Sequence, residues 1–521
     1  MSRKIQIFDS TLRDGNQALG VSFSVDDKLL IAQKIDELGV QYIEGGWPNP
    51  SNQTDVEFFR SAAKRKFKAK VTAFGSTCRP DTSPAKDPIV RTLLSTETQT
   101  VAVFGKSWSL HVTDVLRTSL DENLRMIEDT VAYLKKHGRE VVYDAEHFFD
   151  GYLNNPEYAV KTLMAASNGG ADCLVLCDTN GGRLPMEVER IFSTVKEQVN
   201  AQAWGIHAHN DSGNAVANSL MAVSKGAVHV QGTMNGLGER CGNANLCTII
   251  PNLVLKMDLP CIPAKQLAHL TQVSLFVSEV ANLTPDLRQP YVGEAAFSHK
   301  GGAHIDGVLK NQKTFEHIDP ALVGNERRYV LSDQAGRSTI VEKLQKMKPR
   351  LDKSDPVVKG LLQQIKDLEY KGYQFEAAEG SFQLLARRAF GDFKEPFELK
   401  GFRVIIQKDE DGHTRSEATI KVRKGEEVVH TAAEGDGPIS ALDNAVRKAL
   451  GNFYPGINDV RLEDFKVRVL DGRDGTSATV RVLIESHDGI DHWGTIGVSS
   501  NIIEASWIAL IDSLNYKLMK S

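Results

Sequence analysis

The first half of the chain alternates between short apolar runs and longer segments with helical periodicity. The short runs are rich in β-branched residues and have little polar character, which is typical of strands that are buried on both faces. Amphipathic stretches such as VDDKLLIAQKIDELG and DENLRMIEDTVAYLKKHG separate them, and several of these end on Gly, the usual helix stop. The strands are expected at residues 5–8, 42–44, 69–74, 100–104, 140–143, 173–177, 204–207 and 229–232.

This alternation predicts parallel strands with helices packed outside them. Eight strands over about 235 residues match the number and size of a (β/α)8 TIM barrel. A doubly wound open sheet is the alternative, but it usually has a Gly-rich phosphate-binding turn after its first strand, and DSTLRDG is not such a turn. We therefore predict an α/β chain that begins with a TIM barrel.

The alternation stops after the eighth predicted strand. NANLCTIIPNLVLKM is expected to be a closing helix, residues 265–390 are mostly helical, and from about residue 398 strands with charged faces alternate with Gly and Asp turns. We predict a barrel over residues 1–265, helical linker subdomains over 266–397 and a C-terminal α+β domain over 398–521.

The C-terminal part is internally duplicated. EATIKVRKGEEVVHTAAEGDGPISALDNAVRKAL is echoed by SATVRVLIESHDGIDHWGTIGVSSNIIEASWIALIDSL. Each copy is predicted to form strand, turn, strand, Gly-rich corner and helix, with the helices at 441–450 and 504–514. Such a repeat suggests a module that pairs with itself. A duplicated packing unit without a further role is the alternative.

Composition narrows the classes of function. The 521 residues carry a net charge of −5, so no basic field favours nucleic acid or an anionic membrane. No apolar run approaches the roughly 18–20 residues of a bilayer span, and the N-terminus lacks a signal-peptide core. The six cysteines are sparse and form no CxxC pair. We expect a cytoplasmic protein with reduced cysteines.

Ionisable and amide residues are concentrated after the predicted barrel strands, where the loops of a TIM barrel form its active site. The strongest signal is His207-Ala208-His209, because residues i and i+2 of a strand point to the same side. Asp14, which follows the first strand, is the natural third ligand, since the first and seventh strands end at one rim. Two His and one carboxylate predict a divalent metal with open coordination positions. The alternative is a set of polar residues at strand ends.

A metal of this kind favours a substrate with a carboxylate beside a carbonyl, and it polarises the carbonyl as an electrophile. Arg13 is placed to bind the carboxylate or a developing alkoxide, with a structural salt bridge to Glu44 or Asp14 as the alternative. The competing chemistry is a Schiff-base aldolase, which needs a lysine in the barrel mouth, and Lys106 is the candidate.

Four motifs together resemble one enzyme family. DSTLRDGNQ, HAHND, GLGERCGNANL and SHKGGAHIDGVLKN are similar to the DRE-TIM metallolyases, in the branch of the 2-isopropylmalate, homocitrate and citramalate synthases. The resemblance covers essentially the whole chain. Within that branch IEGGWPNPSNQTD and VVYDAEHFFDGY look like citramalate synthases.

The resemblance implies roles for individual residues. It implies that Asp14, His207 and His209 bind the metal, with Asn243 as a further ligand, and the metal is expected to be Zn, Mn, Co or Mg.

The resemblance further implies that Arg13 and Thr179 hold the keto acid and that Glu146 is a catalytic acid or base. His304 is implied to join the acid–base machinery, often from the partner chain; a histidine in a linker turn is the alternative. The residues themselves suggest Tyr143 as a wall of a small pyruvate pocket, although a lone aromatic residue is as often part of the core. For Glu146 the alternative is a rim carboxylate paired to an arginine.

The activity implied is the condensation of acetyl-CoA with pyruvate to (R)-citramalate and CoA, in isoleucine biosynthesis. The resemblance also implies a homodimer and a C-terminal regulatory domain that is inhibited by isoleucine. The alternatives are a synthase for a longer 2-keto acid, a retro-aldol lyase of the hydroxymethylglutaryl-CoA type and a non-catalytic metabolite sensor. The duplicated C-terminal module disfavours the lyase, and the intact set of metal ligands disfavours the sensor.

Overall fold

The computed structural model describes residues 4–49, 51–332, 334–345, 347–410, 412–471, 475 and 477–520. The chain forms two compact units, Met1–Phe297 with Ile318–Glu326, and Ser298–His317 with Arg327–Ser521. Each unit is described by itself. Within the described residues, no helix has the length and apolar character that a membrane crossing requires.

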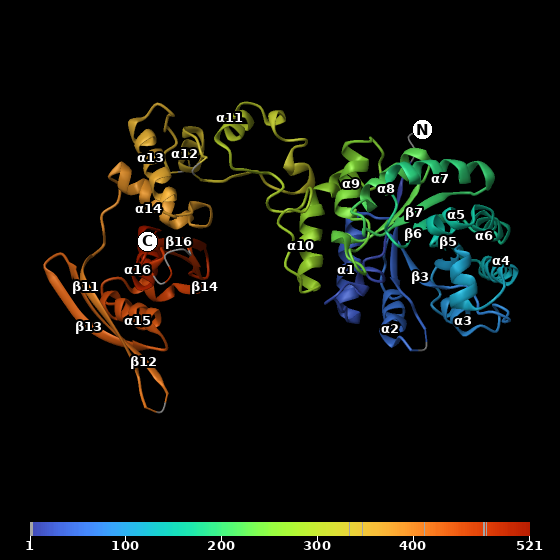
Figure 1. Cartoon of the computed structure of the whole chain (residues 1–521), viewed down its shortest axis with the longest axis horizontal. Helices are drawn as coiled ribbons and strands as arrows, with labels where there is room; N and C mark the ends of the chain where they lie inside the picture. The colour runs from blue at the N-terminus through green and yellow to red at the C-terminus, as the bar shows by residue number, and fades with distance from the viewer. Residues whose placement is uncertain are drawn as a thin grey trace. The chain divides into compact units, whose positions relative to one another are not determined.

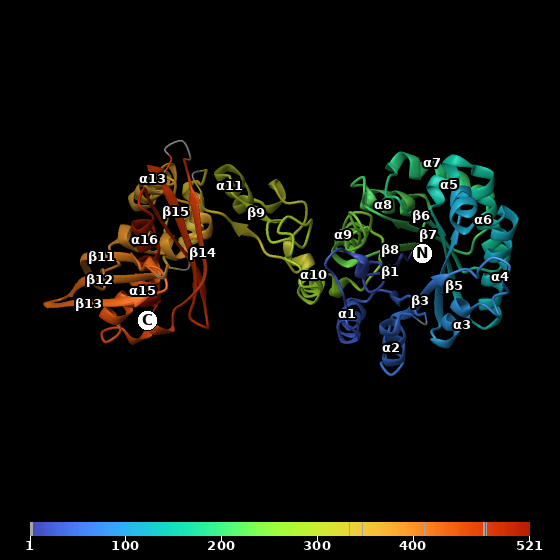
Figure 2. The same ribbon diagram turned by 60° about the horizontal axis from the view of Figure 1, so that its bottom comes forward.

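The first unit is built on a closed barrel of eight parallel strands in the order β1 to β8, with helices around its outside (Figures 1 and 2). Pairing of β1 with β8 closes the barrel, with Asp9 opposite Gly232. The predicted TIM barrel is thereby confirmed. Its strands are β1 (Gln6–Asp9), β2 (Tyr42–Gly46), β3 (Lys70–Ser76), β4 (Thr100–Lys106), β5 (Glu140–Glu146), β6 (Cys173–Asp178), β7 (Trp204–Ala208) and β8 (His229–Gly232).

Helices connect the strands and continue beyond the barrel. The first begins where its sequence predicts, because Ser24 and Asp27 form a reciprocal capping box, and it ends at Gly39 in the left-handed region with φ 92°. The helices of this unit are α1 (Val25–Leu38), α2 (Gln53–Ala62), α3 (Pro88–Ser95), α4 (Leu120–Lys136), α5 (Phe148–Asn154), α6 (Pro156–Asn168), α7 (Pro185–Gln198), α8 (Ala215–Lys225), α9 (Leu246–Leu255) and α10 (Leu270–Val280). Short helical turns are η1 (Gly15–Gln17), η2 (His111–Leu116), η3 (Met234–Gly236), η4 (Ala264–His269) and η6 (Pro320–Val323).

Two hydrophobic layers hold the barrel. Side chains that include Phe8, Val142 and Val175 fill its interior, and a larger cluster packs the outer faces of the strands against the helices. Both faces of each strand are therefore buried, as parallel strands require. Polar side chains then gather at the carboxyl ends of the strands, where the loops begin.

The second unit ends in two copies of one motif, three antiparallel strands followed by a helix. Strands were expected from about residue 398, with two strands in each repeated segment; each copy has a further first strand, β11 or β14, most of whose residues are exposed. The elements are β9 (Ser298–His299), α11 (Gly302–Lys310), η5 (Gln312–Thr314), β10 (Arg328–Tyr329), α12 (Arg337–Leu344), α13 (Pro356–Tyr370), η7 (Phe375–Ala377), α14 (Glu379–Phe390), β11 (Glu398–Lys408), β12 (Thr414–Lys424), β13 (Glu427–Gly435), α15 (Pro438–Leu450), η8 (Pro455–Asp459), β14 (Arg461–Val469), β15 (Val480–His487), β16 (His492–Ser499) and α16 (Ile502–Lys520).

One glycine in each copy lets the helix pack closely on its sheet. A Cβ on Gly435 would lie 2.3 Å from the backbone nitrogen of Ala441 in α15. A Cβ on Gly497 would lie 1.9 Å from the carbonyl oxygen of Ala505 in α16. Distances this short exclude any side chain, so the two copies share the same steric requirement at equivalent corners.

Candidate active site

Polar side chains at the carboxyl ends of the strands surround one cavity of about 190 Å³ in the barrel mouth. Most of its lining comes from the loops and strand ends that sequence analysis singled out. The lining residues are Arg13, Asp14, Gln17, Trp47, Phe74, Phe104, Asp144, Glu146, Cys177, Thr179, His207, His209, Glu239 and Arg240.

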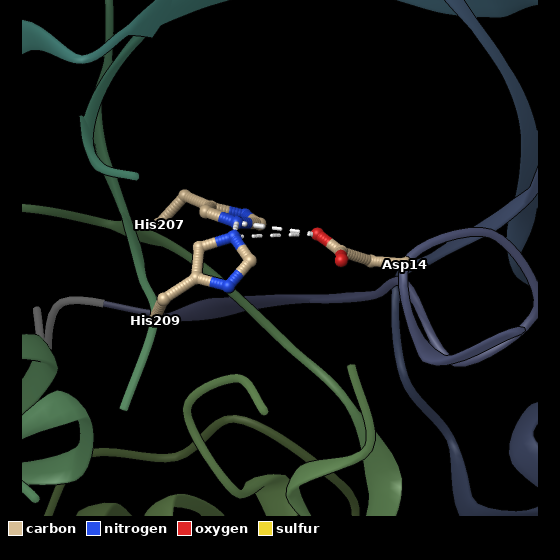
Figure 3. A group of neighbouring side chains, drawn as sticks. All are labelled: Asp14, His207 and His209. Atoms are coloured by element: carbon tan, nitrogen blue, oxygen red, sulfur yellow. Dashed lines mark hydrogen bonds and ion pairs between the residues drawn. The ribbon is translucent and has the colours of Figure 1, made fainter. Parts of the chain in front are cut away.

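Asp14, His207 and His209 converge on one point of this cavity (Figure 3). Oδ2 of Asp14 lies 3.4 Å from Nε2 of His207 and 3.8 Å from Nε2 of His209. The two Nε2 atoms are 3.3 Å apart. Ligand atoms that each lie about 2.0–2.2 Å from one metal ion are separated by roughly 3–3.5 Å, so the three atoms fit a shared divalent cation. Their metal-binding role remains a prediction.

Asn243 lies beside these three residues. It forms an isolated bridge with His209, its Nδ2 donates to the carbonyl of Leu237 at 3.2 Å, and its Oδ1 is buried without a hydrogen-bond partner among the described residues. An unsatisfied buried acceptor is costly unless a ligand completes it. A Cβ on Gly238 would lie 2.2 Å from Nδ2 of Asn243, which explains why a glycine stands there in GLGERCGN.

Charge in the site favours an ionised Asp14. Burial opposes ionisation, but Arg13, His207 and His209 outweigh it and hold the pKa of Asp14 well below its usual range. Burial and the neighbouring His207 lower the pKa of His209 to about 4. For His207 burial lowers the pKa, but the contact with Asp14 outweighs burial and raises it. A carboxylate beside a neutral imidazole is the protonation state that binds a cation.

Arg13 is held on three sides. Its Nε donates to Oε2 of Glu44 at 2.7 Å, its Nη1 lies 3.1 Å from Asp14, and its guanidinium stacks 3.9 Å above the ring of Phe74. Both salt bridges considered as alternatives therefore exist. They use only part of the five N–H donors of an arginine, so donors remain for a substrate carboxylate in the cavity.

Glu146 ends β5 and pairs with Lys106, which ends β4 directly opposite in the parallel register. A rim ion pair with an arginine was the alternative considered for Glu146; an ion pair exists, with a lysine as the cation. It disfavours Lys106 as a Schiff-base lysine, because the nitrogen of such a residue must be open to the substrate carbonyl and that of Lys106 is held by Glu146.

Thr179 also lies in the cavity lining, at the end of β6. Its Oγ1 accepts a hydrogen bond from the backbone N–H of His147 at 2.9 Å. The hydroxyl proton of Thr179 is therefore free to point to a ligand, which is what binding of a substrate carboxylate requires.

Tyr143 does not line the cavity, which corrects the expectation for this residue. It is fully buried in the layer between the barrel and its helices, with its hydroxyl against Gly105. The neighbouring Asp144 takes the inward position, because successive residues of a strand point to opposite faces. The aromatic wall of the cavity is formed by Trp47, Phe74 and Phe104.

The aromatic wall is rigid. Trp47 meets Phe74 and Phe104 edge-on, with ring centroids 5.8 Å and 5.5 Å away, and those two rings stack at 5.3 Å. Asp55 fixes Trp47 by accepting from its backbone N–H at 2.8 Å, and the buried ammonium of Lys28 pairs with Asp55. The only signal for Trp47 in the sequence is its place directly after the second strand.

His304 belongs to the second unit. It is exposed on α11 and stacks on Phe315 with ring centroids 4.1 Å apart. The residue thus lies on a helix, whereas the alternative expectation was a linker turn. Its part in acid–base chemistry remains a prediction.

Comparison with known proteins gives three family matches along the chain. Residues 4–277 match the HMGL-like family, 291–372 the homocitrate synthase post-HMGL domain-like family, and 376–518 the LeuA allosteric (dimerisation) domain.

The chain is also similar over its full length to curated enzymes. It is 56% identical to the (R)-citramalate synthase of Aquifex aeolicus, with 100% of this chain and 99% of that protein covered. The corresponding enzyme of Geobacter sulfurreducens is 54% identical, with 99% and 98% covered. That of Synechocystis sp. is 51% identical, with 98% and 96% covered.

Proposed function

The chain belongs to the (R)-citramalate synthases of the HMGL-like family, and from this membership we propose how its barrel carries out the reaction. The enzyme is an acyltransferase that condenses acetyl-CoA with pyruvate and hydrolyses the resulting thioester, giving (R)-citramalate and CoA. One observation carries this function. The chain is 56% identical to a citramalate synthase over its full length, and its barrel has a small cavity that combines three candidate metal ligands with an arginine.

Asp14, His207, His209 and Asn243 would hold a divalent metal ion in this cavity. The fit rests on the spacing of the three ligand atoms and on the unsatisfied Oδ1 of Asn243. Zn²⁺, Mn²⁺, Co²⁺ and Mg²⁺ all suit this donor set. When bound, such an ion supplies Lewis-acid polarisation of a keto oxygen.

Arg13 and Thr179 bind the carboxylate of pyruvate in this proposal. The guanidinium is prevented from rotating by Glu44 and Phe74, so it presents its remaining donors at a fixed angle. The same group stabilises the alkoxide that forms at C2 when the new carbon–carbon bond is made, because it is already oriented before charge develops.

Glu146 takes the proton from the methyl group of acetyl-CoA. Its side chain lines the cavity and is held in place by the ion pair with Lys106, and a carboxylate is the form that accepts a proton. The enolate carbon then attacks C2 of pyruvate, the alkoxide formed there takes up a proton to give the hydroxyl group, and water cleaves the thioester to release CoA. His304 is proposed to assist proton transfer, a role that rests on its place in the SHKGGAHIDG motif.

The small space that the aromatic wall leaves beside Arg13 supports pyruvate as the preferred keto acid. Trp47, Phe74 and Phe104 narrow the space beside Arg13, and one or two extra methyl groups in such a space cost about 1–3 kcal/mol. Release of CoA thiol measured with acetyl-CoA and a series of 2-keto acids tests the function. Pyruvate should give the highest kcat/KM, and a preference for 2-oxoisovalerate would instead indicate an isopropylmalate synthase.

The C-terminal part matches an allosteric and dimerisation domain, so regulation and self-association are properties of its family. Beyond this we propose a homodimer with isoleucine as feedback inhibitor and a division into catalytic barrel (1–265), helical linker (266–397) and regulatory domain (398–521). A cytoplasmic location is proposed from the six free cysteines.

A further inference from the structure

Inside the barrel, three buried polar side chains form a continuous hydrogen-bonded chain that ends on the proposed metal site. Asp144 on β5, Gln231 on β8 and His207 on β7 are 4%, 0% and 6% exposed. Nε2 of Gln231 donates to Oδ1 of Asp144 at 2.8 Å. Oε1 of Gln231 lies 2.8 Å from Nδ1 of His207. The roles proposed so far use His207 but not Gln231.

The hydrogen bonds among Asp144, Gln231 and His207 all run in one direction, and this direction determines which ring nitrogen of His207 carries the proton. An ionised carboxylate can only accept hydrogen bonds, so Asp144 must receive its bond from the NH₂ end of the amide. That orients the carbonyl end of Gln231 towards His207, and a carbonyl can also only accept. Nδ1 of His207 must therefore carry the proton, which leaves the lone pair on Nε2.

Nε2 is the atom of His207 that faces Asp14, at 3.4 Å (Figure 3). A neutral imidazole with its proton on Nε2 would turn an N–H towards the site and could not bind a cation there. Burial and the charge of Glu44 raise the pKa of Asp144 to about 7, against the opposing charges of His207 and Arg13, so its carboxylate form prevails above that pH. The direction of these hydrogen bonds thus leaves on Nε2 the lone pair that a metal ligand needs.

The second histidine lacks such support. Nδ1 of His209 is buried and has no hydrogen-bond partner among the described residues. No partner on Nδ1 therefore fixes the tautomer of His209, whereas Gln231 does so for His207. The chain through Gln231 is specific to one of the two candidate ligands.

We propose that Gln231 is a positioning residue that fixes the metal-binding tautomer and ring orientation of His207, and that Asp144 orients its amide. The inference rests on the proposed function, since it assumes that His207 is a ligand. Partners of this kind usually change metal affinity by 10–100-fold when they are removed.

Metal affinity of the full-length enzyme tests the proposal without reference to turnover. Enzyme stripped of metal is titrated with Zn²⁺ against a competing chelator at about pH 8, where free histidine is neutral. Gln231→Leu should weaken Zn²⁺ binding 10–100-fold. Gln231→Glu should restore affinity to within about threefold of wild type, because a protonated carboxyl pairs with Asp144 through its O–H and with His207 through its C=O.

A control variant distinguishes the general effect of removing a buried amide from the specific effect of losing control over the tautomer of His207. Gln41 lies near the amino ends of the strands, where its amide bonds the backbone of Ile7, Gly39 and Cys261. Gln41→Leu should lower stability and leave Zn²⁺ affinity unchanged. Equal affinities for Gln231→Leu and wild type, or equal losses in Gln231→Leu and Gln41→Leu, would overturn the proposal.

A spectroscopic measurement keeps the proposal testable if Gln231→Leu does not fold. At a pH where the ring of His207 is neutral, nitrogen-15 NMR of labelled histidines in the metal-free wild-type enzyme should show this ring, assigned by its loss in His207→Asn, protonated on Nδ1. Protonation on Nε2 would contradict the proposal. Citramalate formation by the wild-type enzyme is measured in parallel, so a failure of the positioning role is distinguished from a failure of the proposed function.

Discussion

Lys106 and Glu146 end neighbouring strands in the same parallel register and form an ion pair at the rim of the cavity. Among the described ion pairs, the lysine is the only cation paired with this carboxylate. Lys106 is the candidate residue for the alternative Schiff-base reaction, and Glu146 is the proposed residue for proton transfer. Substitution of Lys106 therefore tests both reactions.

Lys106→Met should lower kcat by roughly 100-fold, the lower end of the range of general-base effects, whereas Lys106→Arg should retain most activity because it keeps the ion pair with Glu146. Treatment of the wild-type enzyme with borohydride and pyruvate should leave its mass and activity unchanged, since no imine forms. Covalent labelling of Lys106 in that experiment would instead support a Schiff-base enzyme.

Removal of the metal should abolish turnover. Exhaustive chelation, Asp14→Ala and His209→Ala should each reduce CoA release by about 100-fold or more, since Lewis-acid stabilisation is worth several kcal/mol and each 1.4 kcal/mol is tenfold in rate. Returning a divalent cation should rescue the chelated enzyme only. His137→Ala, on an exposed ring at the end of α4, is the control and should behave as wild type. Full turnover after chelation would rule out the metal.

The aromatic wall should control substrate size. Phe104→Val opens the space beside Phe74 and Trp47, so kcat/KM for 2-oxoisovalerate relative to pyruvate should rise at least tenfold, as expected for 1–3 kcal/mol of steric cost. Phe192→Val, on the face of α7 that packs against Trp204 of β7, removes a buried ring of the same size and should lower stability without changing this ratio. An unchanged ratio in Phe104→Val would place the keto acid elsewhere.

The fold could be predicted because each strand of a parallel barrel is apolar on both faces and each helix on one, so their alternation is visible in the sequence. The same property explains the error at Tyr143. In EVVYDAE both faces are buried, so polarity does not reveal which residues point inward, and Asp144 takes the place expected for its neighbour.

The metal triad could be predicted because the residues i and i+2 of one strand share a side and parallel strands end at one rim. Gln231 could not, because its contact with Asp144 crosses the barrel interior from β8 to β5 and is not visible in the local sequence pattern. Similarly, the sequence places Lys106 and Glu146 at strand ends but does not give the register that pairs them.

Acid sensitivity of the barrel should depend on His229. Its ring is fully buried between Phe8 and Tyr42, and burial lowers its pKa from the usual 6.5 to about 3. Between these values the unfolded chain binds a proton that the folded chain excludes, so the free energy of unfolding falls as the pH falls from about 6.5 towards 3.

His229→Phe removes this proton and keeps the aromatic packing. In metal-free enzyme its loss of stability on acidification should be shallower than that of wild type, by up to about 1.4 kcal/mol per pH unit. Urea unfolding at a series of pH values measures both slopes. Parallel curves for the two proteins would show that His229 is protonated in the folded barrel.

Isoleucine inhibition should depend on the two corners that join sheet to helix in the C-terminal repeats, Glu434–Gly437 and Gly497–Ser500. Only some of their residues are useful for a test. Gly435 and Gly497 touch helix backbone, so a side chain there would disrupt the fold. Gly437 has φ −154°, and a Cβ added to it would meet no other atom within 4 Å, so Gly437→Val is tolerated sterically while it blocks the corner.

Gly437→Val should raise the isoleucine concentration needed for half-inhibition at least tenfold, with turnover in its absence nearly unchanged, because no catalytic residue is proposed in this part of the chain. Gly360→Ala, equally open in α13 of the same unit, is the control and should be inhibited as wild type. Calorimetric titration of the full-length enzyme should show isoleucine binding, and bound isoleucine and acetyl-CoA should weaken each other by the same factor, since coupling at equilibrium is reciprocal. If isoleucine does not bind the intact enzyme, the regulatory ligand is a different molecule; if it binds Gly437→Val as tightly as wild type, the site lies outside this corner.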